Sequence, residues 1–390
     1  MFKFGKKYLF LMAFYFCLQL AVACYGPYIN VFFKEQGMST SVVGLVASIA
    51  PLAAIFIQPL WANLADKTGK MYSVLVLLLA ASSISMLLYY AVDFKVGYIL
   101  VNILYSVFFT GIPALQDTYV LGIIQKDGHS YSTIRMSATV GYALGVILFG
   151  KVFDLHLSWI FAFGSLFLAV TLTVFLIGVP KVETHIKHSS QNTKQSSFFE
   201  HKFAVMILVL LMGVYMSVSF ISSFIGIFVG EMGYATTYIS VCIFISTFSE
   251  VPVLLMINKL IDRFGEVKLL ILSGILMMVR MVLTSTGILW IIMLMQAMQG
   301  LTYMINVYCG TTLIFRIMPD HLKSKGQSMM FLVQSGIGSI IGTALGGFVA
   351  DKIGFSKTFV VIGVVTFILT LFVLVYYMKN KAQIDKDTAS

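Results

Sequence analysis

The sequence predicts an all-α membrane protein with twelve transmembrane helices in two six-helix, pseudo-symmetric bundles and with both termini in the cytoplasm. Composition and an internal repeat carry this prediction. Of 390 residues, 59% are hydrophobic and 11% are charged, and the mean hydropathy is +0.94. Soluble domains have about a quarter of charged residues. The charge here is too sparse for a water-facing surface, which excludes a soluble enzyme.

The remaining composition excludes several other classes. With 7 Pro and 4 Cys beside 33 Phe, the chain is neither collagen-like, disordered nor a disulfide framework. The net charge of +10 does not indicate a nucleic-acid partner, because the basic residues separate apolar runs instead of clustering. The cysteines lie inside apolar runs without a CxxC pair, so we interpret them as packing residues and expect no metal site or cofactor.

Twelve apolar stretches are long enough to cross a hydrocarbon core, which takes about 20 helical residues. They are predicted at 8–32, 41–64, 71–91, 96–122, 132–153, 158–178, 203–229, 237–258, 268–287, 289–315, 326–349 and 357–378.

The distribution of the 26 Lys and Arg residues sets the orientation. With the amino terminus inside, 19 fall in cytoplasmic loops and tails, five in outer loops and two in spans, as the positive-inside rule requires. We therefore expect an amino-terminal bundle over 1–180, a polar cytoplasmic linker over 181–202, a second bundle over 203–380 and a cytoplasmic tail over 381–390.

The two halves repeat each other in sequence. One set of matching residues is offset by 196 and another by 197, which predicts parallel repeats of the kind found in 6+6 transporters. The first set pairs Glu35, Gly37, Asp66 and Gly69 with Glu231, Gly233, Asp262 and Gly265; the second pairs Gly141, Gly145, Gly150 and Asp154 with Gly338, Gly342, Gly347 and Asp351.

Four charged residues lie inside predicted spans, more than two residues from either end: Asp117, Arg135, Glu250 and Arg280. A charge at the bilayer centre costs about 2.5 to 3.5 kcal/mol on insertion scales, so such residues mark functional sites or paired neighbours. Asp117 and Arg135 can face each other across a hairpin and offer an acceptor and a forked donor to vicinal hydroxyls. Alternatively, Arg135 binds a carboxylate, or the two form a structural ion pair.

Tyr142 follows Arg135 by two helical turns on the same face and is a candidate to stack on a sugar ring. Glu250 lies in the middle of its span, where it is a candidate proton carrier with Arg280 as its partner. A purely structural pair is the alternative.

The tenth span carries a polar stripe at three- and four-residue steps. We interpret Gln299 and Asn306 in it as cavity-lining, substrate-binding residues; interhelical hydrogen bonds would produce the same stripe. The stripe consists of Gln296, Gln299, Tyr303 and Asn306.

The loop between the second and third spans carries an acid, bases and a glycine, and the loop after the eighth span repeats it. This pattern resembles the signature of the major facilitator superfamily, although Ala62 stands where that family usually has Gly. The resemblance implies that these loops hold the cytoplasmic side shut in the outward-facing state. The residues are Asp66, Lys67, Gly69 and Lys70 in the first loop and Asp262, Arg263 and Gly265 in the second.

Within that superfamily, the chain resembles the lactose permease branch of oligosaccharide:proton symporters and its phenylpropionate permease relatives. In lactose permease-like proteins an acid in helix four lies eighteen residues before an Arg in helix five, both bind sugar hydroxyls, and an aromatic residue seven positions later stacks on the sugar. Asp117, Arg135 and Tyr142 keep that spacing. Glu250 and Arg280 match the family's coupling residues by helix, with Glu250 nearer the phenylpropionate pattern.

Helix ten departs from this branch, because Gln299 and Thr302 stand where the family has a His and an acid that titrate. Glu250 would then carry protons with little help, and uniport becomes an alternative.

Together these features predict a secondary transporter of a sugar or glycoside with proton symport in the cytoplasmic membrane, working as a monomer. No ATP-binding or hydrolytic motif appears, so we expect no enzymatic activity. The alternatives are an aromatic-acid or nucleoside permease, a drug efflux pump, and a non-transporting sensor or chaperone on the same scaffold.

Overall fold

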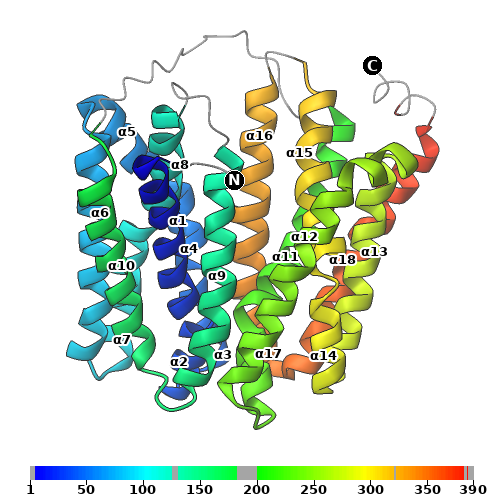
Figure 1. Cartoon of the computed structure of the whole chain (residues 1–390). Coiled ribbons are helices and arrows are strands. Elements are labelled where there is room, and N and C mark those ends of the chain that lie inside the picture. Colours follow the sequence, from blue (N-terminus) through cyan, green and yellow to red (C-terminus); the bar gives the residue numbers. More distant parts are fainter. Residues whose placement is uncertain (1–4, 125–130, 182–199, 320–321, 382–383, 385–390) are drawn as a thin grey trace. The chain divides into compact units, whose positions relative to one another are not determined.

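The computed structural model describes residues 5–124, 131–181, 200–319, 322–381 and 384, and all regular secondary structure in these ranges is helical (Figure 1). Eleven helices in them are long and apolar enough to cross a membrane. The other predicted span, 289–315, is interrupted. It consists of α14 (Leu289–Gln296), the π-helical turn η3 (Gly300–Met304) and α15 (Ile305–Ile317). The prediction of an all-helical fold with twelve helical spans is confirmed.

The first half of the chain forms six helical spans, several of them bent where one helix passes directly into the next. They are α1 (Lys6–Tyr25) with α2 (Ile29–Glu35); α3 (Thr40–Ala47) with α4 (Ile49–Phe56) and α5 (Gln58–Thr68); α6 (Met71–Leu87) with η1 (Leu88–Ala91); α7 (Lys95–Phe109) with α8 (Gly111–Ile124); α9 (Tyr131–Phe153); and α10 (Trp159–Gly178).

The second half forms the other spans. They are α11 (Lys202–Glu231); α12 (Thr236–Phe264); α13 (Glu266–Thr284); the interrupted span of α14, η3 and α15; α16 (Lys323–Phe331) with the π-helical turns η5 (Leu332–Gly338) and η6 (Ile341–Leu345) and α17 (Gly346–Ile353); and α18 (Phe355–Lys379).

The chain divides into two compact units that follow its two halves except for two exchanged segments. Unit 1 contains residues 1–38 and 49–189 together with 234–241, the beginning of α12. Unit 2 contains residues 190–233 and 242–390 together with 39–48, which includes α3. Most of the predicted linker and of the carboxy-terminal tail lies outside the described residues.

The repeat found in the sequence is visible in the backbone. Gly37 and Gly233 have φ angles of 72° and 82°, and Gly69 and Gly265 have φ angles of 65° and 80°. A side chain disfavours this left-handed region, so both halves need glycine at the same two turns.

The repeat extends to helix packing. A Cβ on Gly141 of α9 would lie 2.6 Å from the carbonyl oxygen of Phe16, and one on Gly338 of η5 would lie 3.1 Å from that of Met212. Phe16 and Met212 are themselves 196 residues apart. Each of these glycines thus permits close backbone packing inside its own unit, as small residues do in membrane bundles.

Two aspartates bind the exchanged segments in the same manner. In unit 1, the backbone N–H of Thr237 donates to Asp154 at 3.1 Å, and the hydroxyl of Thr237 donates to the other carboxylate oxygen. In unit 2, the N–H of Thr40 donates to Asp351 at 3.1 Å, and the hydroxyl of Ser41 donates to it at 2.7 Å. Each carboxylate satisfies an N–H at the start of a helix, where no intrahelical partner exists.

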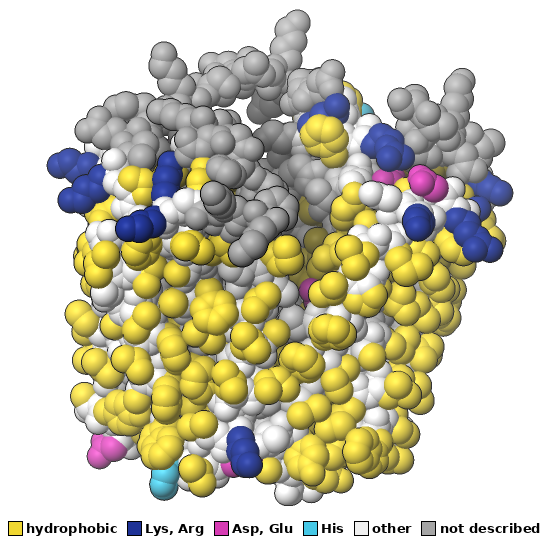
Figure 2. All heavy atoms as spheres, viewed as in Figure 1, with side chains coloured by type: hydrophobic (Ala, Val, Ile, Leu, Met, Phe, Trp, Pro, Cys, Tyr) yellow, Lys and Arg dark blue, Asp and Glu magenta, His cyan; other side chains and the backbone are white. Residues whose placement is uncertain are grey.

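The surface matches a lipid environment. Figure 2 shows hydrophobic side chains over most of the visible face, with most of the Lys and Arg in view beyond its upper edge and further Lys or Arg at its lower edge. Many large hydrophobic side chains are exposed, with Leu255 80% and Trp290 76% exposed, and so extensive an apolar surface suits lipid better than water.

Candidate functional site

The four charged residues predicted within spans belong to two clusters, one in each unit. The first cluster consists of Tyr15, Asp117, Tyr131 and Arg135, contributed by α1, α8 and α9 of unit 1. The second cluster consists of Glu250, Arg280, Gln296, Gln299 and Thr302, contributed by α12, α13 and the interrupted tenth span of unit 2.

In the first cluster Asp117 and Arg135 form the expected ion pair. Arg135 Nη1 lies 2.7 Å from Asp117 Oδ2 and also donates to the hydroxyl of Tyr131 at 3.0 Å. The hydroxyl of Tyr15 donates to Asp117 Oδ1 at 2.6 Å, so each carboxylate oxygen accepts a hydrogen bond.

The ion pair is open to an approaching molecule. The side chain of Arg135 is 59% exposed and that of Asp117 is 34% exposed. Both of these hydrogen bonds of Arg135 use Nη1, which leaves Nε and Nη2 as donors without a partner among the described residues. Tyr142 lies two turns further along α9 and is half-buried.

Sequence reasoning missed Tyr15 and Tyr131. Tyr131 begins α9 and is four residues before Arg135, a spacing that places both on one helix face and could have identified it. Tyr15 is 102 residues from Asp117, and its contact depends on how α1 packs in unit 1.

The second cluster is organised around Arg280, which is only 1% exposed. Its Nη2 donates to Gln296 Oε1 at 2.8 Å, and its Nη1 donates to Thr302 Oγ1 at 3.2 Å and to Gln299 Oε1. Arg280 Nε is buried without a hydrogen-bond partner. All three acceptors are neutral.

A direct pair between Glu250 and Arg280 was expected, and the structure corrects that expectation. Glu250 Oε1 accepts a hydrogen bond from Gln299 Nε2 at 3.4 Å, while Gln299 Oε1 accepts from Arg280. The amide of Gln299 therefore lies between the acid and the base. The direct pair does not form because Arg280 donates its hydrogen bonds to neutral side chains of helix ten instead of to Glu250.

The polar stripe of helix ten is divided between several roles. Gln296 and Gln299 accept hydrogen bonds from Arg280, as the interhelical alternative required. Tyr303 packs against Tyr215 of α11, with ring centroids 5.6 Å apart. Asn306 is 0% exposed, and neither of its amide atoms has a partner, so it lines no open surface in this conformation.

The loop residues predicted to control the cytoplasmic side lie at helix ends. Gly69 ends α5, and its N–H donates to the carbonyl of Asp66 at 3.3 Å. Gly265 separates α12 from α13, and the guanidinium carbon of Arg263 lies 5.3 Å from the centroid of the Phe264 ring. Lys67, Lys70 and Asp262 are exposed.

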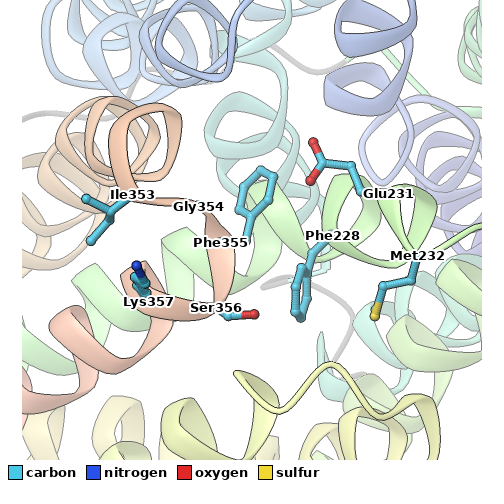
Figure 3. Close-up of a pocket in the computed structure, with 8 residues that line it drawn as sticks. All are labelled: Phe228, Glu231, Met232, Ile353, Gly354, Phe355, Ser356 and Lys357. Carbon is cyan, nitrogen blue, oxygen red and sulfur yellow. The ribbon is translucent and has the colours of Figure 1, made fainter.

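A separate pocket of about 340 Å³ lies in unit 2 where α11 and α17 end and α18 begins. Figure 3 shows the rings of Phe228 and Phe355 together with the side chains of Glu231 and Lys357 around it. It contains no member of either cluster. Among the described residues, no group of three or more His, Cys, Asp or Glu is placed to hold a metal ion.

Comparison with known proteins identifies relatives along nearly the whole chain. The model of the family described as "MFS_1 like family" matches residues 8–361. The "Uncharacterized transporter YwbF" of Bacillus subtilis (strain 168) is 25% identical over 387 residues, covering 96% of this chain and 95% of that protein. The "Maltose permease" of Geobacillus stearothermophilus is 22% identical over 371 residues, covering 94% of each.

A solved structure shares the fold. The crystal structure of the nucleoside transporter NupG has a TM-score of 0.82 at 17% identity, covering 95% of this chain and 99% of that chain. At this identity the likeness concerns the fold alone.

Proposed function

This chain belongs to the MFS_1 like family of secondary transporters, and from that premise we propose that it imports a neutral, polyhydroxylated solute, a sugar or glycoside, together with a proton. It is a multi-pass membrane protein of the cell membrane and not an enzyme. The proposal refines the family assignment to the lactose permease-like branch, which the identity to a maltose permease supports.

The exposed Asp117–Arg135 pair carries the proposal. Because the two charges neutralise each other at 2.7 Å, the site has no excess charge that a charged ligand would need to balance. Arg135 still offers Nε and Nη2 as a planar pair of donors, which suits two adjacent oxygen atoms. Adjacent hydroxyls of a sugar meet that geometry, and Tyr142 would stack on the apolar face of its ring.

The same observation argues against an aromatic acid. A carboxylate ligand would have to compete with Asp117 for Arg135. Arg280 is not an alternative partner in this conformation, because it is 1% exposed and already donates three hydrogen bonds.

A nucleoside, the substrate class named for the structural neighbour NupG, is the second candidate. Its ribose also carries adjacent hydroxyls and would use the same donors on Arg135. The nucleobase would then lie where the remainder of a sugar or glycoside lies in the first proposal.

Proton coupling is assigned to Glu250, since Gln299 and Thr302 do not titrate. Glu250 is half-buried, and it accepts a hydrogen bond from the neutral amide of Gln299, a setting in which gaining and losing a proton changes the local charge. Two bundles over 1–180 and 203–380 would alternate access to the site, with the loops at Asp66 and Asp262 on the cytoplasmic side. Gln299 and Asn306 would contribute to binding only after a conformational change.

The test is proton uptake by proteoliposomes after addition of maltose, uridine or 3-phenylpropionate, with Glu250→Gln and Asp117→Asn measured in parallel. We expect external alkalinisation with maltose, its loss in Glu250→Gln, and loss of ligand flux in Asp117→Asn. Uridine as the active ligand would select the second candidate.

Two results would contradict the proposal. Ligand flux without proton movement in the wild type would establish uniport. Uptake of 3-phenylpropionate alone would establish an acid permease and would show that Arg135 releases Asp117 to bind it.

A further inference from the structure

The second cluster contains a neutral amide, that of Gln299, between the buried base Arg280 and the acid Glu250. The proposed proton-coupling role of Glu250 does not explain this arrangement. In the described part of the chain, the hydrogen bonds that link Arg280 to Glu250 pass through Gln299, whose Oε1 accepts from Arg280 and whose Nε2 donates to Glu250 at 3.4 Å. Gln296 also accepts from Arg280, at 2.8 Å, but among these residues it makes no hydrogen bond to Glu250.

The chemistry of the amide fixes its orientation while Glu250 is ionised. A guanidinium only donates and a carboxylate only accepts, so the amide oxygen must face Arg280 and the amide nitrogen must face Glu250. Reversing the amide would place donor against donor and acceptor against acceptor. A protonated Glu250 can also donate a hydrogen bond. Glu250 then no longer fixes the orientation of the Gln299 amide.

Helix ten is fixed to both neighbours at this point. The N–H of Gly300 donates to Ser249 Oγ at 3.1 Å, and a Cβ on Gly300 would meet the carbonyl oxygen of Ser249. Residues 299 and 300 therefore contact residues 250 and 249 of α12, while Gln299 and Thr302 contact Arg280 of α13. The π-helical turn η3 begins at Gly300, and such turns occur often at functional sites.

We propose that Gln299 is the positioning residue that couples the protonation of Glu250 to Arg280 and helix ten, in place of a second titratable group. This inference rests on the proposed proton-coupling role of Glu250. Among the described residues, the other charged or titratable groups that interact with Glu250 are Arg280 on α13, Tyr215 on α11 and Tyr303 on η3. The two tyrosines pack against each other, and the side-chain hydrogen bond to the acid comes from Gln299.

The chain offers a matched pair of variants to test this. Gln299→Met and Gln296→Met each remove one neutral acceptor from Arg280 with little change in volume, but only the first removes the donor to Glu250. Each protein is reconstituted in liposomes and titrated by infrared difference spectroscopy, with the Glu250 carboxyl band identified by its loss in Glu250→Gln.

We expect the carboxyl of Glu250 to keep its proton to a pH about one unit higher in Gln299→Met than in the wild type, because a hydrogen bond to the carboxylate is lost. In Gln296→Met the band should titrate as in the wild type. Equal displacement in both variants, or none in either, would overturn the inference, as would a wild-type band that does not titrate.

If Gln299→Met does not fold, Gln299→Glu and Gln296→Glu replace the pair, since both keep an acceptor for Arg280. The first places a carboxyl group against Glu250 and should again displace its titration, whereas the second should not. Wild-type proton uptake in the same liposomes separates the two proposals. If wild-type proton uptake is absent, the proposed function is contradicted. If it is present and Glu250 titrates equally in the two Gln variants, only the role of Gln299 is contradicted.

Discussion

At the scale of single residues, burial decides what each charged side chain can do. Arg135 is 59% exposed and has two donor nitrogens that meet no partner in the part of the chain that the structure describes, whereas Arg280 is 1% exposed and uses both terminal nitrogens. An exposed, paired guanidinium can bind a ligand without a large desolvation penalty, but a buried one serves mainly to hold its neighbours. The sequence shows two arginines in spans, and only their surroundings distinguish their roles.

Tyr15 provides a prediction at this scale. Tyr15→Phe removes the donor to Asp117 Oδ1 at 2.6 Å while the ring stays buried. We expect ligand affinity to fall about fivefold, since a hydrogen bond to a charged group contributes on the order of 1 kcal/mol or more. Equilibrium exchange of maltose or uridine in proteoliposomes measures this.

The control for Tyr15→Phe is Tyr25→Phe, which removes a buried hydroxyl from the same helix. Tyr25 donates to Asn102 at 2.6 Å, away from Asp117. Equal losses of affinity in the two variants would show that Tyr15 acts through helix packing and not through Asp117.

At the scale of helices, glycines and capping residues set how closely the elements approach. The tenth span is interrupted by η3 where Gly300 meets α12, and the aspartates at 154 and 351 bind the starts of α12 and α3. Hydropathy locates each helix, but these contacts position the helices within their units. The repeated offsets of 196 and 197 in the sequence therefore reflect helix packing as well as turns.

Gly300→Ala should lower the unfolding temperature of the purified protein, because the added Cβ meets a backbone oxygen that cannot move aside. Overpacking of this kind costs roughly 1 to 3 kcal/mol. The matched control is Gly310→Ala in α15, where the new Cβ would lie 2.8 Å from the flexible end of the Leu211 side chain. A larger loss in Gly310→Ala than in Gly300→Ala would contradict the prediction.

Asp154→Ala and Asp351→Ala should each destabilise the protein by about 1 kcal/mol, the typical effect of losing a helix cap. Because the two contacts lie in different units, the losses in unfolding temperature should add in the double variant. Thermal unfolding in detergent measures all three. A double variant no less stable than either single variant would show that only one cap forms in solution.

At the scale of the whole molecule, lipid exposure and charge distribution set the orientation. Lys67 lies in the last turn of α5 and is expected on the cytoplasmic side, whereas Lys357 lies in the first turn of α18 and is expected outside. In a variant without the four native cysteines, a membrane-impermeant thiol reagent added to intact cells should label Lys357→Cys and not Lys67→Cys. The reverse result would invert the topology and the assignment of the gating loops.

The sequence by itself determined the membrane class, the twelve helical spans, the repeat and the charged residues within the spans, because hydropathy and residue spacing are local properties. It also predicted the pair of Asp117 with Arg135, which lie in adjacent spans joined by a hairpin. Only the tertiary structure placed Tyr15 on Asp117 and Gln299 between Glu250 and Arg280. Tyr15 lies 102 residues from Asp117, and Glu250 lies 49 residues from Gln299. Arg280 and Gln299 are only 19 residues apart, but which of the polar side chains on neighbouring helices meet depends on the rotation and depth of each packed helix.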